Sequence, residues 1–220
     1  MALAAGGLLT LIHDYLTVTL RANQVVSGLA LTLFGSGLSD YLGKAYVGMR
    51  AEHTFGKLPI PGLSDIPIIG PVVFKQDILV YISYVLVAAT AFYLYKTRAG
   101  LFLRALGENP AAVDSVGINV FRLRYFYVMI GGALAGLGGA YLSLAYAPSW
   151  LENMTAGRGW IAVALVIFAI WDPWRALAGS YLFGGVDALG FHLQVIGLPI
   201  SIFILNMLPY IFTILVLILV

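Results

Sequence analysis

Long apolar runs alternate with shorter polar breaks along this sequence. A helix needs roughly 20 mainly apolar residues to cross the hydrocarbon core of a bilayer, and about six runs reach that length. They cover residues 1–20, 23–42, 78–96, 125–147, 176–196 and 198–220. The pattern predicts an all-α integral membrane protein: a polytopic helical bundle of about six spans in a single transmembrane domain over residues 1–220.

A further apolar run lies between Trp160 and Trp171 and is too short to fit this scheme. At 1.5 Å per residue it extends only about 17 Å, less than the separation of the aromatic belts at the two membrane surfaces. Either the helix begins nearer Met154 and crosses at a tilt, or it is broken and ends at membrane depth, as half-helices in transporters do. The sequence leaves both possibilities open.

Two polar segments separate the runs, and their charges suggest an orientation. The segment 97–124 and its edges carry more cations than anions, so the positive-inside rule places it in the cytoplasm. The longest loop, residues 43–77, is then external, although it contains Lys44, Arg50, Lys57 and Lys75. The cations that decide the orientation are Lys96, Arg98, Arg104, Arg122 and Arg124, against Glu108 and Asp114.

Composition supports this class and excludes others. The chain is 61% hydrophobic and 10% charged, far from the balance of a soluble domain. It contains no cysteine, and His13, His53 and His192 do not form a zinc-binding pattern. Its basic residues are too few and too scattered for a nucleic-acid surface. Neither a nucleophile elbow nor a phosphate-binding loop occurs, which argues against an enzyme.

Polar side chains at membrane depth are the first functional candidates, because burying them in lipid is unfavourable unless they face a cavity or a partner. Amides and hydroxyls on one helix could line a path for a neutral polar solute such as a sugar or nucleoside, and Phe34 could stack on a ring. Ordinary hydrogen bonding between helices is the alternative. The candidate path residues are Asn23, Gln24, Ser27, Thr32, Phe34 and Asp187, with Ser36 beside them; Asp187 alternatively ends a helix near the interface.

A stripe of small residues follows residue 125. Gly132, Gly136 and Ala140 recur every four positions, which would let another helix backbone approach closely in lipid. The surrounding sequence also resembles the first apolar run around Gly6, leaving an internal duplication open. We interpret the stripe as helix packing, because its glycines lack the spacing of a nucleotide-binding loop.

The segment RALGENPAAVDSVGIN, residues 104–119, predicts a short capped helix within the cytoplasmic loop. Asn109 suits an N-cap, Pro110 the first helical position, and Gly117 the position after the helix ends. About seven helical residues extend only about 10 Å, too short to span a bilayer. Ala111, Ala112 and Ser115 leave small faces, and Glu108 and Asp114 are available for charge pairing. Such a helix is suited to insert as a rigid knob into a groove on another protein, although it could also be a simple connector.

These residues resemble the coupling-helix loop of membrane permeases from ATP-binding cassette (ABC) importers, in the branch that serves simple sugars and nucleosides. Residues 20–35, 58–74, 157–185 and 208–219 resemble the nucleoside permeases that work with lipoprotein receptors of the basic membrane protein family. The resemblance covers nearly the whole chain and implies a type II importer-like permease.

The resemblance implies a transporter subunit rather than an enzyme, located in a bacterial or archaeal cell membrane. A cytoplasmic ABC ATPase, a second permease that is a different chain, and an extracytoplasmic solute-binding lipoprotein would complete it. ATP and Mg²⁺ would bind the ATPase, so no cofactor is expected in this chain. The loop 43–77 would face the lipoprotein, and part of the path would lie along 23–36. The residues expected to contact the ATPase are Glu108, Asn109, Pro110, Ala111, Ala112, Asp114 and Gly117.

Two expectations concern the extent and the class of the protein. Permeases of this family carry additional spans before the position that corresponds to Met1, so we expect an N-terminally truncated form. The expected solute is a nucleoside, with a simple sugar of the ribose type as the alternative. A self-contained secondary transporter is a further alternative, for which Asp187 is the one supporting residue.

Overall fold

The computed structural model describes residues 1–49, 51, 54–67, 69–155, 157–196 and 201–219. The chain divides into two compact units. The first comprises Met1–Ile82 and Arg98–Thr155, and the second comprises Ser83–Thr97 and Ala156–Val220. The expectation of one transmembrane domain over residues 1–220 stays a prediction.

The prediction of an all-α membrane protein is confirmed, whereas the number of spans stays a prediction. Within the described part of the chain, 4 helical segments have the length and apolar composition to cross a membrane. They are Ala2–Thr19, Gln24–Tyr46, Ile78–Lys96 and Val120–Tyr146. Each coincides with one of the apolar runs identified in the sequence.

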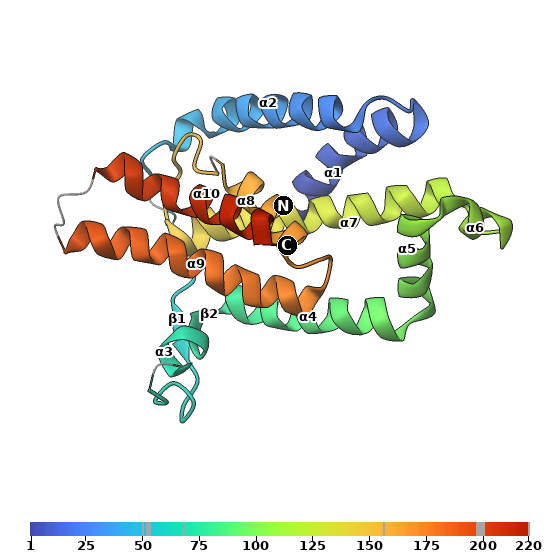
Figure 1. Ribbon diagram of the computed structural model, residues 1–220. Coiled ribbons are helices and arrows are strands. Elements are labelled where there is room, and N and C mark those ends of the chain that lie inside the picture. Colours follow the sequence, from blue (N-terminus) through green and yellow to red (C-terminus); the bar gives the residue numbers. More distant parts are fainter. Residues whose placement is uncertain (50, 52–53, 68, 156, 197–200, 220) are drawn as a thin grey trace. The chain divides into compact units, whose positions relative to one another are not determined.

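The first unit begins with a helical hairpin (Figure 1). Helix α1 (Ala2–Asp14) continues into a π-helical turn (Tyr15–Thr19), and α2 (Gln24–Gly43) follows after a short link. The side chain of Asn23 starts α2, because its Oδ1 accepts the backbone N–H groups of Val25 at 2.9 Å and Val26 at 3.2 Å. The hairpin therefore turns where the sequence places a helix-capping residue.

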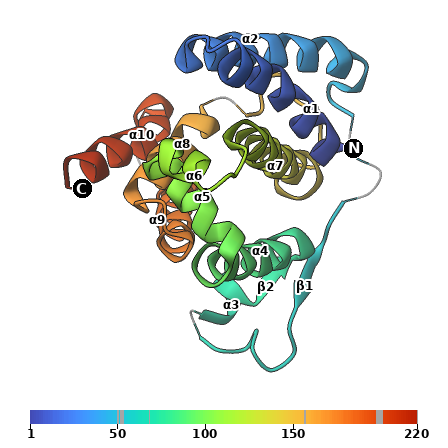
Figure 2. The same cartoon turned by 90° about the vertical axis from the view of Figure 1, so that its right-hand side faces the viewer.

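Helix α7 (Val120–Tyr141), which ends in a π-helical turn (Leu142–Tyr146), packs against α1 (Figure 2). It begins earlier than the predicted residue 125 because the Asn119 side chain caps it, accepting the N–H of Arg122 at 2.9 Å. The two helices run antiparallel: Gly136 lies near Ala2, and the Thr19 hydroxyl is 2.6 Å from that of Tyr125. The first apolar run thus packs on the one whose sequence it resembles.

The predicted loop 43–77 contains short structured elements. A 3-10 turn (Lys44–Tyr46) leads toward β1 (Lys57–Pro59), which pairs antiparallel with β2 (Lys75–Asp77), and α3 (Ile69–Val73) lies between the strands. The Tyr81 hydroxyl donates to the carbonyl of Leu58 at 2.9 Å. This bond ties the hairpin to the start of α4 (Ile78–Lys96).

The segment 97–124, which the sequence predicts to be cytoplasmic, is more helical than expected. Residues 98–108, interpreted as loop, form helix α5 (Arg98–Glu108), and the short helix α6 (Pro110–Ser115) follows. The interpretation missed α5 because the run is neither apolar enough nor long enough for a span. It is instead amphipathic: Gly100 and Leu106 are buried, while Arg98 and Arg104 are exposed.

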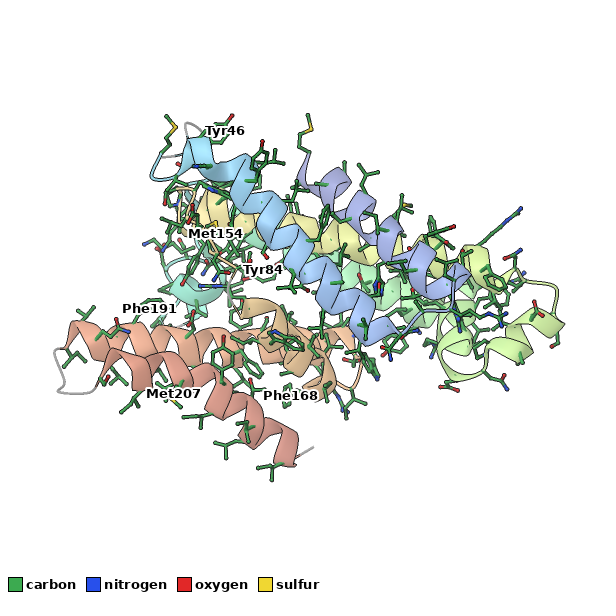
Figure 3. All side chains as sticks on the ribbon, turned by 90° about the horizontal axis from the view of Figure 1, so that it is seen from above. Tyr46, Tyr84, Met154, Phe168, Phe191 and Met207 are labelled. Carbon is green, nitrogen blue, oxygen red and sulfur yellow. The ribbon has the colours of Figure 1, made fainter. Side chains whose placement is uncertain are left out.

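The second unit contains most of α4 together with α8 (Arg158–Phe168), α9 (Pro173–Val195) and α10 (Ile202–Leu219). Helix α8 packs on α9, where Gly179 lies against the ring of Phe168. Helix α10 joins α9 through an edge-to-face contact of Phe183 with Phe212 at 5.2 Å between ring centroids. Figure 3 labels Phe191 on α9 and Met207 on α10, both of which are about half exposed.

The structure excludes one of the two interpretations of the short run near Trp160, and an end at membrane depth stays a prediction. Helix α8 begins at Arg158, preceded by Gly157 in the left-handed conformation (φ 72°), and ends at Phe168. Met154 lies in a turn, so the helix does not start there. A left-handed residue cannot continue an α-helix backward, and this fixes α8 as a short helix of 11 residues.

Candidate functional site

The short helix α6 is the most distinctive local structure in the segment 97–124. Asn109 caps it, its Oδ1 accepting the N–H of Ala112 at 3.2 Å, and Pro110 occupies the first helical turn. Gly117 ends it with a positive φ of 80°, its N–H donating to the carbonyl of Asp114 at 2.9 Å. These three residues hold the helix at both ends, as their types in the sequence suggest.

One buried side chain anchors α6 while its other faces remain open. Val113 is only 2% exposed, whereas Ala111, Ala112 and Asp114 are exposed, as are the flanking Glu108 and Asn109. Val116 is 66% exposed just after the helix. The anchoring role of Val113 was not predicted, although it is the one branched apolar residue of α6. The result is a small, rigid projection with an alanine face.

The candidate path residues on α2 do not share one face. Ser27 is buried, and its Oγ lies 3.0 Å from Nδ1 of His13 on α1. Thr32 is five positions later, about 140° around the helix axis, and its exposed hydroxyl donates to the carbonyl of Gly28 at 2.9 Å. Ser27 therefore contributes to the contact between α1 and α2, and Thr32 faces away from it.

The remaining α2 candidates are exposed. Asn23 uses its side-chain oxygen to cap the helix, Gln24 carries an exposed amide, and Phe34 is 53% exposed. Ser36 donates to the carbonyl of Leu33 at 3.0 Å. Their assignment to a solute path stays a prediction. Asp187 is half-buried on α9 of the second unit.

The glycine stripe of α7 lies against α1. A Cβ atom on Gly132 would collide with the side chain of Thr10 and lie 2.8 Å from the carbonyl oxygen of Gly6. A Cβ atom on Gly136 would lie 3.3 Å from the Cα atom of Gly6 and closer still to Ala2. The backbones of α1 and α7 therefore meet directly at Gly136, while at Gly132 the side chain of Thr10 also packs against the glycine. Ala140, the third member of the stripe, is partly exposed.

Sequence reasoning gave too little weight to Asp14. Asp187 is the one acid among the predicted path residues, yet Asp14 is fully buried at the junction of α1 with its π-helical turn. Neither carboxyl oxygen has a hydrogen-bond partner among the described residues. The neighbouring His13 is bonded to Ser27. The available signal was two adjacent polar residues in a span, which are unfavourable in lipid unless they are enclosed.

Two side-chain bonds between α4 and α9 also escaped prediction. The hydroxyls of Tyr84, labelled in Figure 3, and Tyr181 form a short hydrogen bond. Near the other end of α4, the Tyr95 hydroxyl donates to Oδ2 of Asp172 at 2.8 Å. The backbone N–H of Arg175, together with the Tyr95 hydroxyl, lowers the pKa of Asp172 below its ordinary value. Tyr84 and Tyr95 of α4 thus form hydrogen bonds to residues of the same unit.

The candidate residues take part in contacts between helices, and those of α6 form an exposed projection. Among the described residues, no group of three or more histidine, cysteine, aspartate or glutamate side chains comes together as a metal site. The described spans present hydroxyls and amides on otherwise apolar helices, and α6 lies between two of those spans in the chain. Such a chain is suited to forming part of a membrane path and to contacting another protein.

Comparison with known proteins identifies the class. Residues 1–220 match the family described as the permease component of the branched-chain amino acid transport system. The chain belongs to this family of transport permeases. The resemblance to ABC importer permeases is thereby confirmed.

Particular relatives are named for several solutes. The chain is 42% identical over 207 residues to the putative glucose ABC transporter permease protein TsgC13 of Haloferax volcanii, covering 91% of this chain and 62% of that protein. It is 37% identical to the guanosine permease protein NupQ of Bacillus subtilis, covering 98% of this chain and 70% of that protein. It is 39% identical to the nucleoside permease protein NupC of Lactococcus lactis, covering 96% and 69%, respectively.

The chain therefore spans about two thirds of the length of these relatives, between 62% and 70%. No solved structure matches it. The multi-pass membrane character of the chain rests on its family and on its apolar helices together.

Proposed function

We propose that this chain is the permease subunit of an ABC importer that moves a nucleoside into the cytoplasm across a bacterial or archaeal cell membrane. The observation that carries the proposal is helix α6: it is capped by Asn109, anchored by Val113 and exposed at Ala111 and Ala112. A projection of this kind can transmit a movement only if it is rigid and fits a groove closely, and both caps serve that rigidity.

In this proposal the chain has no catalytic residues, and a partner supplies the energy. A cytoplasmic ATPase would receive α6 and hydrolyse ATP with Mg²⁺, a second permease chain would complete the path, and an extracytoplasmic lipoprotein would deliver the solute. The names of NupQ and NupC support the nucleoside assignment. Hydroxyls and amides along α2, such as those of Gln24 and Thr32, suit an uncharged polar solute.

A simple sugar is the second candidate. It is favoured by the glucose permease relative, which shares 42% identity with this chain. Sugars and nucleosides both present hydroxyls, so the same polar side chains could serve either. The difference lies in the base, which needs an apolar or aromatic surface such as Phe34.

The experiment is ATP-dependent uptake of labelled guanosine by vesicles that contain this chain with the sister permease, ATPase and lipoprotein of its own transport system. We expect Ala112→Glu to lower uptake at least about tenfold, because an unpaired charge in a close protein contact costs several kcal/mol. Binding of guanosine to the lipoprotein should not change. Asn109→Ala should have a smaller effect, since it removes a cap and keeps the contact surface.

A matched control places the same charge elsewhere in the cytoplasmic segment. Ala99 is exposed on α5, and Ala99→Glu should leave uptake within a factor of about two, as is usual for a solvated surface substitution. Competition by unlabelled glucose but not guanosine would favour the sugar candidate. Uptake that persists without any ATPase would refute the importer proposal.

A further inference from the structure

The turn that joins α8 to α9 holds two bulky residues in a strained conformation. Ile170 and Trp171 have positive φ angles of 49° and 58°. This region is unfavourable for side chains other than glycine and especially for β-branched and bulky ones. Backbone bonds enforce it: the N–H of Ile170 donates to Ile167 at 3.0 Å, and that of Asp172 donates to Ala169 at 3.0 Å. The turn therefore has a defined shape rather than a loose one.

This shape presents apolar side chains outward. Ile170 is 56% exposed, Trp171 73% and Trp174 54%. None of them is among the path or coupling candidates. Many apolar side chains of this chain are exposed, and the strained backbone that holds these three in place makes the turn a candidate interaction surface.

A side-chain bond fixes the level of this turn along a membrane-spanning helix. The Tyr95 hydroxyl donates to Oδ2 of Asp172 at 2.8 Å, and Tyr95 is the penultimate residue of the candidate span α4. The turn consequently lies level with the end of this candidate span, where the boundary between hydrocarbon and headgroups is expected. Tryptophan is enriched at this boundary because its ring is apolar while its N–H needs a polar partner.

The charges beside the turn favour an anionic surface. Arg175 and Lys96 are both exposed. The one acid of the turn, Asp172, already uses both carboxyl oxygens: Oδ1 accepts the N–H of Arg175 at 2.9 Å, and Oδ2 accepts the Tyr95 hydroxyl. Asp172 stays ionised and offsets one of these cations, so Arg175 and Lys96, which follows Tyr95 in the chain, leave a net positive charge near the turn. An arginine that lies close to two tryptophans in the sequence suits a phosphate at the lipid surface.

We propose that the turn formed by Ile170, Trp171, Trp174 and Arg175 binds the headgroup of an anionic phospholipid, with Arg175 at the phosphate and both indoles in the interfacial layer. The proposal depends on the membrane-spanning character of α4 and not on which solute is carried. A protein partner is less well supported, because the bond of Tyr95 to Asp172 ties the surface to the end of a span.

Quenching of tryptophan fluorescence by brominated lipid tests this proposal in vesicles containing the full chain. Mixed vesicles of phosphatidylglycerol and phosphatidylcholine are prepared twice, once with bromine on the phosphatidylglycerol and once with bromine on the phosphatidylcholine. The emission of the turn is obtained by subtracting the emission of the double variant Trp171→Phe, Trp174→Phe from that of the wild type. We expect phosphatidylglycerol to be enriched about fivefold at these two residues, the effect of one arginine at an anionic surface.

Substitutions at two arginines distinguish a specific headgroup site from a general attraction of the protein to anionic lipid. Arg175→Gln should remove the preference for phosphatidylglycerol, and Arg175→Lys should retain part of it because the charge remains. Arg122→Gln makes the same change at an exposed arginine near the start of α7 and should leave the preference intact.

The wild-type comparison is sufficient to overturn the proposal, even if a variant fails to fold. Equal quenching by the two brominated lipids would exclude an anionic headgroup site. Weak quenching by both lipids, together with strong quenching by aqueous iodide, would place the turn outside the bilayer and favour a protein partner. A preference that survives in correctly folded Arg175→Gln would exclude Arg175 as the phosphate ligand.

Discussion

The helix pair α1–α7 of the first unit and the helix pair α4–α9 of the second are joined by opposite kinds of contact. In the first pair, Gly132 and Gly136 bring the α7 backbone against Gly6 with no side chain between them. In the second pair, the tyrosine hydroxyls of α4 reach across to Tyr181 and Asp172. The first contact depends on glycines that have no side chain, and the second depends on single hydroxyl groups.

Because the two contacts differ, the two helix pairs should tolerate different substitutions. Close backbone packing gains dispersion energy over many atoms, so one added methyl group separates the helices and weakens all of these contacts together. A hydroxyl bridge is local, so its loss should leave the packing around it largely unchanged. Added volume should therefore damage α1–α7, and removal of hydroxyls should mildly affect α4–α9.

The largest expected effect comes from adding a methyl group to the glycine contact. Gly132→Ala should lower the free energy of unfolding by about 2–3 kcal/mol, as overpacked positions do, because its Cβ would collide with Thr10. Gly131→Ala is the control, since a Cβ at Gly131 meets nothing within 4 Å. It should be neutral or stabilising by up to about 1 kcal/mol. Thermal unfolding in detergent measures both, and equal destabilisation would refute the close contact.

A smaller effect is expected where α1 meets α2 through one hydrogen bond. Ser27→Ala should lower the free energy of unfolding by about 1 kcal/mol, because it removes the partner of His13. Ser36→Ala removes a hydroxyl that bonds within its own helix and should change stability by less than about 0.5 kcal/mol. Chemical unfolding of the two variants tests this, and a larger loss in Ser36→Ala would be inconsistent with the observed contacts.

The tyrosine bridge can be measured with a double-mutant cycle. Tyr84→Phe and Tyr181→Phe should show a coupling energy of about 0.6 kcal/mol, the average for hydrogen bonds between membrane helices. Tyr84→Phe and Tyr95→Phe act on separate bonds and should be additive within about 0.3–0.5 kcal/mol. If the first pair is additive as well, the bond between the hydroxyls contributes nothing to stability.

The smallest expected effect is a dependence of stability on pH, through Asp172 at one end of the α4–α9 contact. The N–H of Arg175 and the Tyr95 hydroxyl hold the pKa of Asp172 below its ordinary value. The stabilisation is present above the pKa of an unfolded aspartate, about 3.9, and is lost as the pH falls through the lower folded pKa. Unfolding of wild type and Asp172→Asn should therefore differ at pH 6 and converge toward pH 2. Curves that stay parallel throughout would exclude this role.

The sequence predicted elements whose signals are local. The apolar run 78–96 coincides with α4 (Ile78–Lys96), because a continuous apolar run of that length has one favourable conformation in a bilayer. The caps of α6 were likewise readable, since Asn109 and Gly117 act on backbone groups a few residues away. Helix α5 was missed because its amphipathic pattern is short and lies between stronger apolar signals.

The candidate site was predicted less completely than the helices. The small face of α6 could be read from Ala111 and Ala112, but its anchor Val113 could not, because burial depends on neighbouring helices. Ser27 was named for a solute path, and the structure places it against His13. Asp14 was passed over, since nothing in the order of residues shows that its carboxyl group is enclosed.

The sequence by itself determined the class of the protein, most of its membrane-crossing helices and the ends of α6, because hydropathy and capping act within one segment. Tertiary structure decided which segments meet. The glycines of α7 could have packed on any helix, and Tyr84 and Tyr181 are 97 positions apart in the chain. Such pairings depend on how complementary two helix surfaces are in space, and this complementarity exists only after both helices have formed and packed.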